Sequence, residues 1–158
     1  MGGGKDFGVR TRKVMEKVGG QICDRVYVGD FEVYRERTIA SGVELERETL
    51  HIQDDKGRVA LVDTLRIENG SAVPTLEEII RYQLNNHLGS STVEVDKIGD
   101  LISYQEYYAF GGSSYLAGRS ASEVRQKQYM YAGKERDNGT GLDYYGARYY
   151  GSLSLIHI

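Results

Sequence analysis

Three residues in the middle of the chain have the types that a nucleophilic hydrolase uses: His87, Ser90 and Asp96. A catalytic triad needs the histidine within hydrogen-bond reach of the serine, and an acid that orients the histidine. Closeness in sequence does not supply that geometry, and the Gly-x-Ser-x-Gly turn that exposes a nucleophilic serine is missing. We therefore interpret His87 as a residue that stabilises a turn by bonding backbone carbonyls, and we predict no catalytic residue.

Thiol and metal chemistry are equally poorly supported. Cys23 is the only cysteine, so no internal disulfide and no thiolate metal cluster can form. It lies in the alternating stretch Ile22–Val28, which favours a small strand residue over a nucleophile. His51 and His87 are far apart in the sequence and no His-x-x-x-His pair exists, so we expect no zinc site.

A run of alternating glutamates is the remaining candidate for a cation site. Glu44, Glu46 and Glu48 fall on one face of the predicted strand 43–48. Like charges on one strand face are usually just solvated, so we assign this face to water. We predict neither a bound metal nor a cofactor.

Tyrosine is the commonest aromatic residue in the chain, and most tyrosines follow Arg81. Aromatic faces can stack on sugars, which leaves a glycan-binding role open. Cross-strand aromatic pairs also stabilise a sheet by roughly 0.2–1 kcal/mol each, and we favour this structural use. The charge run Lys134–Asp137 is expected to lie between strands, with exposed ion pairs across a hairpin worth about 0–1 kcal/mol.

The composition indicates a β-rich globular chain. Of 158 residues, 20 are glycines, 13 are tyrosines and one is proline, a mixture that suits strands joined by tight turns. The net charge of −3 gives no reason to expect nucleic acid, whose binding needs a basic surface. No apolar run approaches the roughly 20 residues that a membrane-spanning helix needs, and the N-terminus lacks a signal-peptide core.

Turn residues between alternating segments predict hairpins. Gly29-Asp30 should form a two-residue type II′ turn, because glycine in the first position matches the strand twist. Residues 50–62 read as strand, turn and strand, and the pattern returns at 93–104, with an Asp-x-x-Gly turn in each copy. These two copies indicate a repeat array.

Two segments contain helix signals. Thr75 and Glu78 have capping-box spacing, yet Ile80–Leu84 also alternates as a strand would; both readings stay open on local grounds. Ser120–Gln128 has the same capping spacing and is the other candidate for a short helix.

Three blocks of the second half carry a family resemblance. Arg81–Ser90 ends in Asn-His-Leu-Gly-Ser, Glu106–Gly112 contains Tyr-Tyr-Ala-Phe-Gly, and Tyr131–Tyr150 reads YAGKERDNGTGLDYYGARYY. All three resemble the core of Rhs/YD-repeat proteins, in the branch that includes the C subunits of insecticidal toxin complexes. The block 131–150 is the hallmark of that core. The resemblance also places Ile80–Leu84 on a strand.

The resemblance implies a mainly β fold: an antiparallel strand-turn-strand ribbon of a YD-repeat spiral shell, with at most one or two short helices. It implies a structural shell segment that encapsulates a C-terminal toxin and has no catalytic activity of its own. Its partners would be the rest of its own shell, the enclosed toxin and a B-type subunit of a toxin complex. The parent would be a secreted or cell-surface bacterial protein.

Two alternatives remain. One is a YD-repeat surface adhesion or glycan-binding module. The other is the upstream part of a self-cleaving aspartyl-protease-like core, whose catalytic segment resembles Asp-Pro-x-x-Gly-Arg-Trp and has no match here.

The resemblance also divides the chain. Residues 1–10 are expected to be an irregular fragment start, residues 11–150 part of the repeat-associated core, and residues 151–158 a non-native tail. Within that tail, 153–158 reads like a translated sequencing adaptor.

Overall fold

The computed structural model describes residues 10–152. Within them the chain is mostly antiparallel β, as expected, with one short α-helix and one 3₁₀ turn. The chain divides into two compact units. The N-terminal unit comprises Thr11–Gln83 and Asp96–Gly99. The C-terminal unit comprises Arg10, Leu84–Val95 and residues 100–152 of the described chain. The expected adaptor-like segment 153–158, and all of the irregular start except Arg10, lie outside the described residues.

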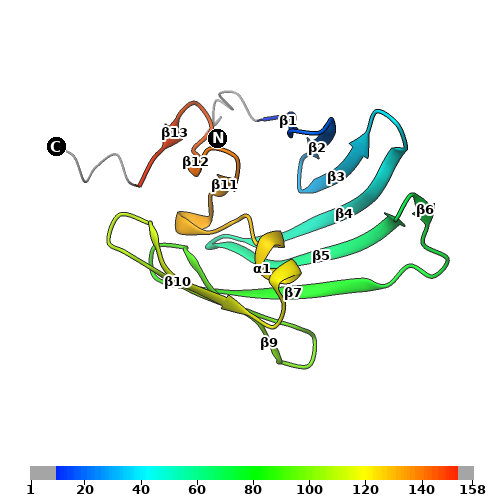
Figure 1. The fold of residues 1–158 in the computed structure, drawn as a ribbon. Helices are drawn as coiled ribbons and strands as arrows, with labels where there is room; N and C mark the ends of the chain where they lie inside the picture. The colour runs from blue at the N-terminus through cyan, green and yellow to red at the C-terminus, as the bar shows by residue number, and fades with distance from the viewer. Residues whose placement is uncertain (1–9, 153–158) are drawn as a thin grey trace, which may run out of the picture. The chain divides into compact units, whose positions relative to one another are not determined.

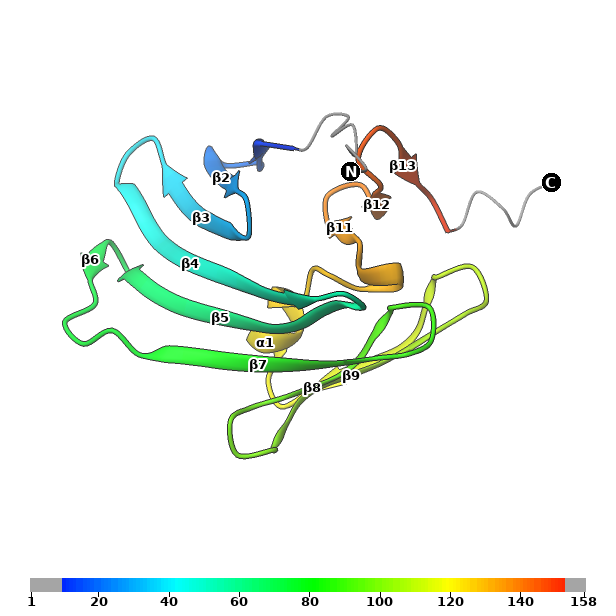
Figure 2. The same ribbon diagram turned by 180° about the vertical axis from the view of Figure 1, so that it is seen from behind.

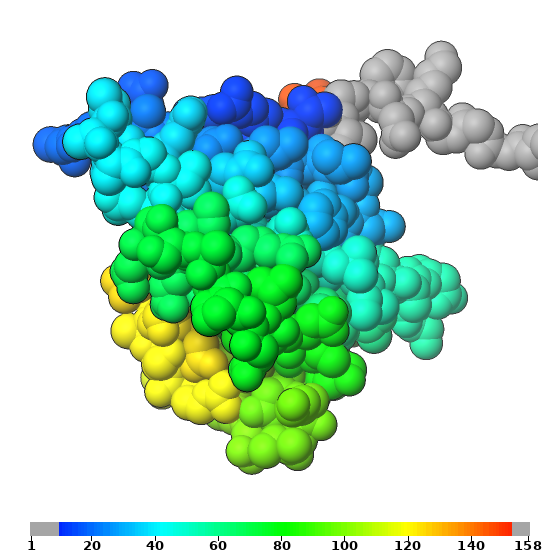
Figure 3. Space-filling view, turned by 90° about the vertical axis from the view of Figure 1, so that its right-hand side faces the viewer, coloured from blue at the N-terminus to red at the C-terminus, as the bar shows by residue number. Residues whose placement is uncertain are grey.

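The N-terminal unit is a meander of antiparallel strands (Figures 1 and 2). Its strands are β1 (Arg12–Glu16), β2 (Gln21–Val28), β3 (Phe31–Thr38), β4 (Gly42–Asp54), β5 (Gly57–Glu68), β6 (Ser71–Ala72) and most of β7 (Glu78–Asn85). Each pairs with the next along the chain, except that β7 pairs with β5 and the short β6 lies off this path against the end of β5. The end of the β4–β5 hairpin, coloured teal, projects beyond its neighbours in Figure 3.

The predicted turns are confirmed. Gly29 has φ +60°, and Asp30 is not among the described residues with positive φ, as a type II′ turn requires. At the tip of β4–β5, the Asp54 carboxylate accepts hydrogen bonds from the backbone N–H groups of Lys56 and Gly57, at 2.8 and 3.0 Å. Asp96 caps Ile98 N–H in the same way at 3.0 Å, so both Asp-x-x-Gly copies use one local chemistry.

Ile80–Leu84 is a strand, as the resemblance indicated. Ile80 stands opposite Val62, and Tyr82 opposite Ala60, in the β5–β7 ladder. The helix alternative is wrong because the neighbouring strand supplies a ladder of backbone hydrogen bonds, which a local capping signal cannot match.

The two faces of the N-terminal sheet differ in a way the strand alternation did not predict. One face buries polar groups, among them Arg25, Glu32, Thr49, His51 and Asp63. The opposite face carries a row of directly opposed apolar residues across five strands: Val28, Phe31, Leu50, Val62 and Ile80. Leu50 remains 45% exposed in this row.

The glutamates of β4 are not simply solvated, which corrects our assignment of that face to water. Glu46 accepts a hydrogen bond from Arg35 Nε at 2.5 Å, and Glu48 from Arg66 Nε at 2.7 Å. Both carboxylates are mostly buried, because arginines on the adjacent strands β3 and β5 cover them.

The C-terminal unit contains two sets of paired strands. The first has β8 (Ser91–Val95), β9 (Leu101–Tyr107) and β10 (Ser113–Gly118), antiparallel in that order. After β10 comes α1 (Ala121–Gln126), capped by Ser120, whose side-chain oxygen accepts from Glu123 N–H at 3.2 Å. The second helix candidate is therefore confirmed, although it ends two residues earlier than 128. The hallmark segment then begins with a 3₁₀ turn (Tyr131–Gly133).

Candidate functional site

The hallmark segment forms a sheet of its own in the C-terminal unit. Its strands are β11 (Glu135–Asp137), β12 (Leu142–Tyr144) and β13 (Tyr149–Tyr150), paired antiparallel. The charge run that we expected between strands is thus largely a strand itself. Glu135 and Asp137 are only 5% and 8% exposed, so the expectation of exposed ion pairs is also wrong. Both carboxylates accept hydrogen bonds from the Arg10 guanidinium, which compensates the cost of burying them.

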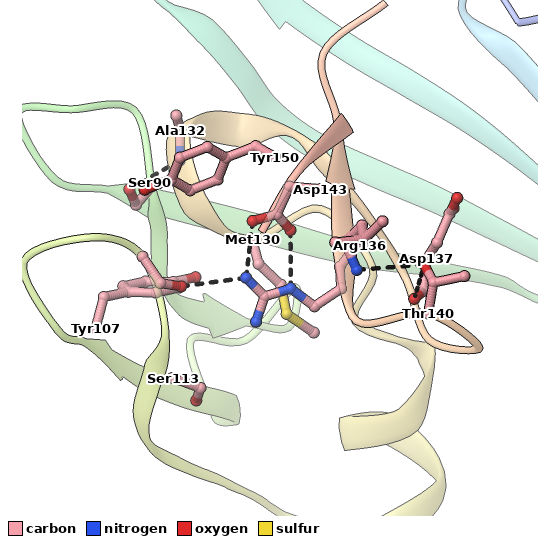
Figure 4. A network of polar contacts seen from close by, with 12 residues as sticks. Ser90, Tyr107, Ser113, Met130, Ala132, Arg136, Asp137, Thr140, Asp143 and Tyr150 are labelled. Carbon is pink, nitrogen blue, oxygen red and sulfur yellow. Dashed lines mark hydrogen bonds and ion pairs between the residues drawn. The ribbon is translucent and has the colours of Figure 1, made fainter. Parts of the chain in front are cut away.

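Arg136 and Asp143 form the centre of this site (Figure 4). They stand directly opposite each other on β11 and β12. Arg136 donates through Nε and Nη2 to the two oxygens of Asp143, both at 2.8 Å, and Asp143 is fully buried. Arg136 Nη2 also donates to the carbonyl of Gly111 at 3.1 Å. Hydrogen bonding to Asp143 raises the pKa of Arg136, so the guanidinium stays charged.

A second arginine reaches the same sheet from far away in the sequence. Arg10 donates to both oxygens of Asp137, at 2.9 and 3.0 Å, and to Glu135 at 3.1 Å. Its guanidinium lies 4.0 Å from the centre of the Tyr144 ring and donates to the Tyr149 hydroxyl at 2.9 Å. This fork binds β11, β12 and β13 together. No sequence signal singled out Arg10, which falls in the expected irregular start.

Tyr107 connects the hallmark to β8 and β9. Its hydroxyl donates to the carbonyl of Ser91 at 2.7 Å, and lies 2.9 Å from Gln105 Oε1. In Figure 4 the hydroxyl points toward Arg136. Burial raises the pKa of Tyr107 far above its usual value; the charges of Glu94 and Asp143 add to this, and Arg136 opposes it. The phenol is therefore neutral and serves as a hydrogen-bond donor.

The raised pKa of Tyr107 predicts a loss of stability in alkali. An unfolded tyrosine ionises near pH 10, whereas the folded side chain resists ionisation, so its contribution is complete below about pH 10 and falls as the pH rises further. Tyr107→Phe should flatten this alkaline loss, measured as the free energy of urea unfolding against pH. Tyr108→Phe, at a ring that is 66% exposed, is the control and should keep the wild-type profile. Equal slopes for wild type and Tyr107→Phe would contradict the assignment.

The structure does not assemble the triad considered from the sequence. Ser90 is fully buried, and its hydroxyl accepts from the backbone N–H of Ala132 at 2.9 Å (Figure 4). Asn86, not His87, stabilises the turn: its side-chain oxygen accepts from Leu88 N–H at 2.9 Å and Ser90 N–H at 3.1 Å. His87 itself is exposed, and the side-chain hydrogen bonds that hold this turn come from Asn86.

The buried polar face of the N-terminal unit is a second cluster. Glu32 pairs with Arg25 and lies 3.4 Å from His51 Nε2. Arg58 Nε donates to His51 Nδ1 at 2.9 Å, so that ring nitrogen is an acceptor. Thr49 donates to Asp63 at 2.5 Å. Each buried carboxylate here thus has a basic or hydroxyl partner.

Neither cluster has the arrangement of a catalytic pair. The buried carboxylates Asp63, Asp137 and Asp143 each accept hydrogen bonds from an arginine or a hydroxyl. Cys23 is a buried residue of β2, as predicted. Both clusters can fix the register of neighbouring strands, and they pair the charges that the fold buries.

The described residues contain no group of three or more His, Cys, Asp or Glu side chains placed to hold a metal ion. The described helices are all too short or too polar to cross a membrane.

No family model matches the chain. Among curated proteins it is 42% identical to "Toxin subunit YenC1" of Yersinia entomophaga over 114 residues. That match covers 72% of this chain but spans only 12% of the length of the relative.

Solved structures of toxin-complex proteins are also similar to this chain. The crystal structure of TcdB2-TccC3 matches 92% of this chain with a TM-score of 0.78 and 32% identity. The Photorhabdus luminescens Tc holotoxin pore with the TccC3-D651A mutation matches 94%, with a TM-score of 0.79 and 32% identity. In both cases the chain corresponds to 7% of the matched chain.

Proposed function

The chain is a homologue of one stretch of the C subunits of toxin complexes. We propose that it has a structural part in such a complex and forms part of the wall of a shell that encloses a C-terminal toxin. The observation that carries this proposal is the match of 92% of the chain, at 32% identity, to a short stretch of TcdB2-TccC3.

The site chemistry supports a wall segment without catalysis of its own. The hallmark sheet directs its charges at each other: Arg136 at Asp143, and Arg10 at Asp137. Such ion pairs hold neighbouring strands together. Because the charged groups of each pair bind one another, they are not directed at a substrate. In this proposal residues 11–150 are part of the repeat-associated core and residues 151–158 stand outside it. The partners are the remaining shell, the enclosed toxin and a B-type subunit, and the complex is secreted.

A chimera tests this proposal. This chain replaces the matching stretch of Toxin subunit YenC1, and protease resistance of the C-terminal region of the chimera is followed with time. We expect protection close to that of the parent subunit. The same chimera carrying Asp143→Ala is the matched control, and should release its cargo to the protease because the buried Arg136 loses its partner. A folded chimera whose C-terminal region is digested as fast as the free segment would disprove the proposal.

A further inference from the structure

Two Asn-Gly pairs occur in the chain, Asn69-Gly70 and Asn138-Gly139. Asparagine is among the thermally labile residues of proteins, because the backbone nitrogen of the next residue can attack its side-chain carbon. Glycine in the next position favours this attack, since it has no Cβ to hinder the approaching nitrogen. The order of residues thus marks two equal candidates for a spontaneous covalent modification, and the fold distinguishes them.

The nitrogen of the first pair is held by a carbonyl of another strand. Asn69 and Gly70 form the two-residue turn between β5 and β6, with φ of +51° and +74°. The Gly70 N–H donates to the carbonyl of Glu44 in β4 at 2.9 Å. This nitrogen must leave its acceptor before it can attack, which should slow the reaction by about fivefold.

The second pair lies in a turn that leaves its nitrogen without an acceptor. The carbonyl of Asp137 accepts from the N–H groups of Thr140 and Gly141, at 3.0 and 2.7 Å; Figure 4 labels the first two residues. In such a turn the N–H groups of Asn138 and Gly139 have no carbonyl to reach, as in the first turn of a helix. Among the described residues, none accepts from the Gly139 N–H. Both residues of the pair are exposed, so water reaches them.

We propose that Asn138-Gly139 is the preferred site of spontaneous deamidation in this chain. The Gly139 nitrogen loses its proton and bonds to the side-chain carbon of Asn138, and the side-chain amide takes up a proton and leaves as ammonia. Water then opens the resulting succinimide ring at either carbonyl and gives aspartate or isoaspartate. All reacting groups belong to one turn and to water, so the reaction needs no partner and does not depend on the proposed shell function.

Isoaspartate changes the hairpin that carries the buried ion pair. Its backbone runs through the former side chain, so the connection between β11 and β12 becomes one methylene group longer. These strands pair Asp137 with Leu142 and Arg136 with Asp143. Because the length of the turn fixes the register of a hairpin, the longer turn should loosen the contact between Arg136 and Asp143.

Peptide mapping by mass spectrometry tests the choice of site. The full chain is incubated in mildly alkaline heavy-oxygen water, which labels the new carboxyl group, and conversion is followed at both asparagines. Asn138 should convert about fivefold faster than Asn69 or more, because only the Gly70 nitrogen must leave an acceptor. In urea the two sites should react at similar rates, since the hydrogen bond to Glu44 is then lost. Equal rates in the folded chain, or faster conversion at Asn69, would overturn the proposal.

Two variants separate the parts of the effect. Gly139→Ala places a Cβ next to the attacking nitrogen, and should slow conversion at Asn138 while that at Asn69 stays unchanged. Asn138→Asp adds the new charge without the longer backbone. The isoaspartate chain, purified after incubation, should therefore unfold at a lower urea concentration than Asn138→Asp. Equal urea midpoints for the two chains would refute the loosening of the hairpin.

Discussion

Replacing Asp143 by alanine is expected to cost about 3–5 kcal/mol of unfolding free energy, the usual effect of removing one partner of a buried ion pair. Asp143 is fully buried and holds Arg136 through two hydrogen bonds of 2.8 Å. Without it, the Arg136 charge stays inside the C-terminal unit and keeps its hydrogen bond to the Gly111 carbonyl, a neutral acceptor. Because whole domains are stable by about 5–15 kcal/mol, this loss is a large share of the total. Urea unfolding followed by tyrosine fluorescence measures it.

Two further variants separate burial from charge. The Arg119–Glu123 pair has the same charges, but Arg119 is 48% exposed, and Arg119→Ala should cost about 0.5 kcal/mol or less. The double replacement Arg136→Met with Asp143→Leu should recover most of the Asp143→Ala loss, because apolar groups of similar volume need no partner. If Asp143→Ala and Arg119→Ala cost the same, the pair is not the lock that the geometry indicates.

The second large effect is expected at Gly111, where alanine should destabilise the chain by about 2–5 kcal/mol, the sum of a backbone effect and a packing effect. Gly111 has φ +85°, a left-handed conformation that costs an L-residue roughly 1–2 kcal/mol. An added Cβ would also overlap the Tyr131 ring, and overpacking of this kind costs about 1–3 kcal/mol. The Tyr131 ring cannot move away easily, because other rings pack against it. Its centroid lies 6.3 Å from that of the stacked Tyr150 ring and 5.9 Å from that of the tilted Tyr107 ring.

Gly141→Ala is the matched control for this prediction. Gly141 has φ +71°, and a Cβ added there would meet no other atom within 4 Å, so its replacement adds the backbone strain alone. In a Tyr131→Ala background the cost of Gly111→Ala should fall toward that of Gly141→Ala. Equal losses at Gly111 and Gly141 in the wild-type background would show that the contact with Tyr131 has no energetic effect.

Local patterns were enough to predict the β class, the turns and the short helix. Glycine at position 29 and Asp54 at a turn start act through their own backbone neighbours, and so does the Ser120 cap. The resemblance carried the assignment of Ile80–Leu84 to a strand, where local signals were balanced. Its decisive partner, β5, is distant in sequence.

The sequence could not show which charged residues are buried. Glu135 and Asp137 read as part of an exposed charge run, yet they are among the least exposed residues of the hallmark sheet. Their partner Arg10 lies 125 and 127 residues earlier in the chain. Spacing rules describe neighbours within an element, so an ion pair over that separation leaves no periodic signal.

The order of residues was sufficient to establish the alternation of strands and turns and, through the hallmark Tyr131–Tyr150, the kinship to toxin-complex subunits. These follow from nearest neighbours and from residue identity. The folded chain was needed to show that His87 is exposed while Asn86 makes the turn, and that Ser90 binds the backbone of Ala132. It was needed also to show that Asp143 and Arg136 are buried together. Burial and partner choice depend on which strands meet across the fold, and that information is spread over residues far apart in the chain.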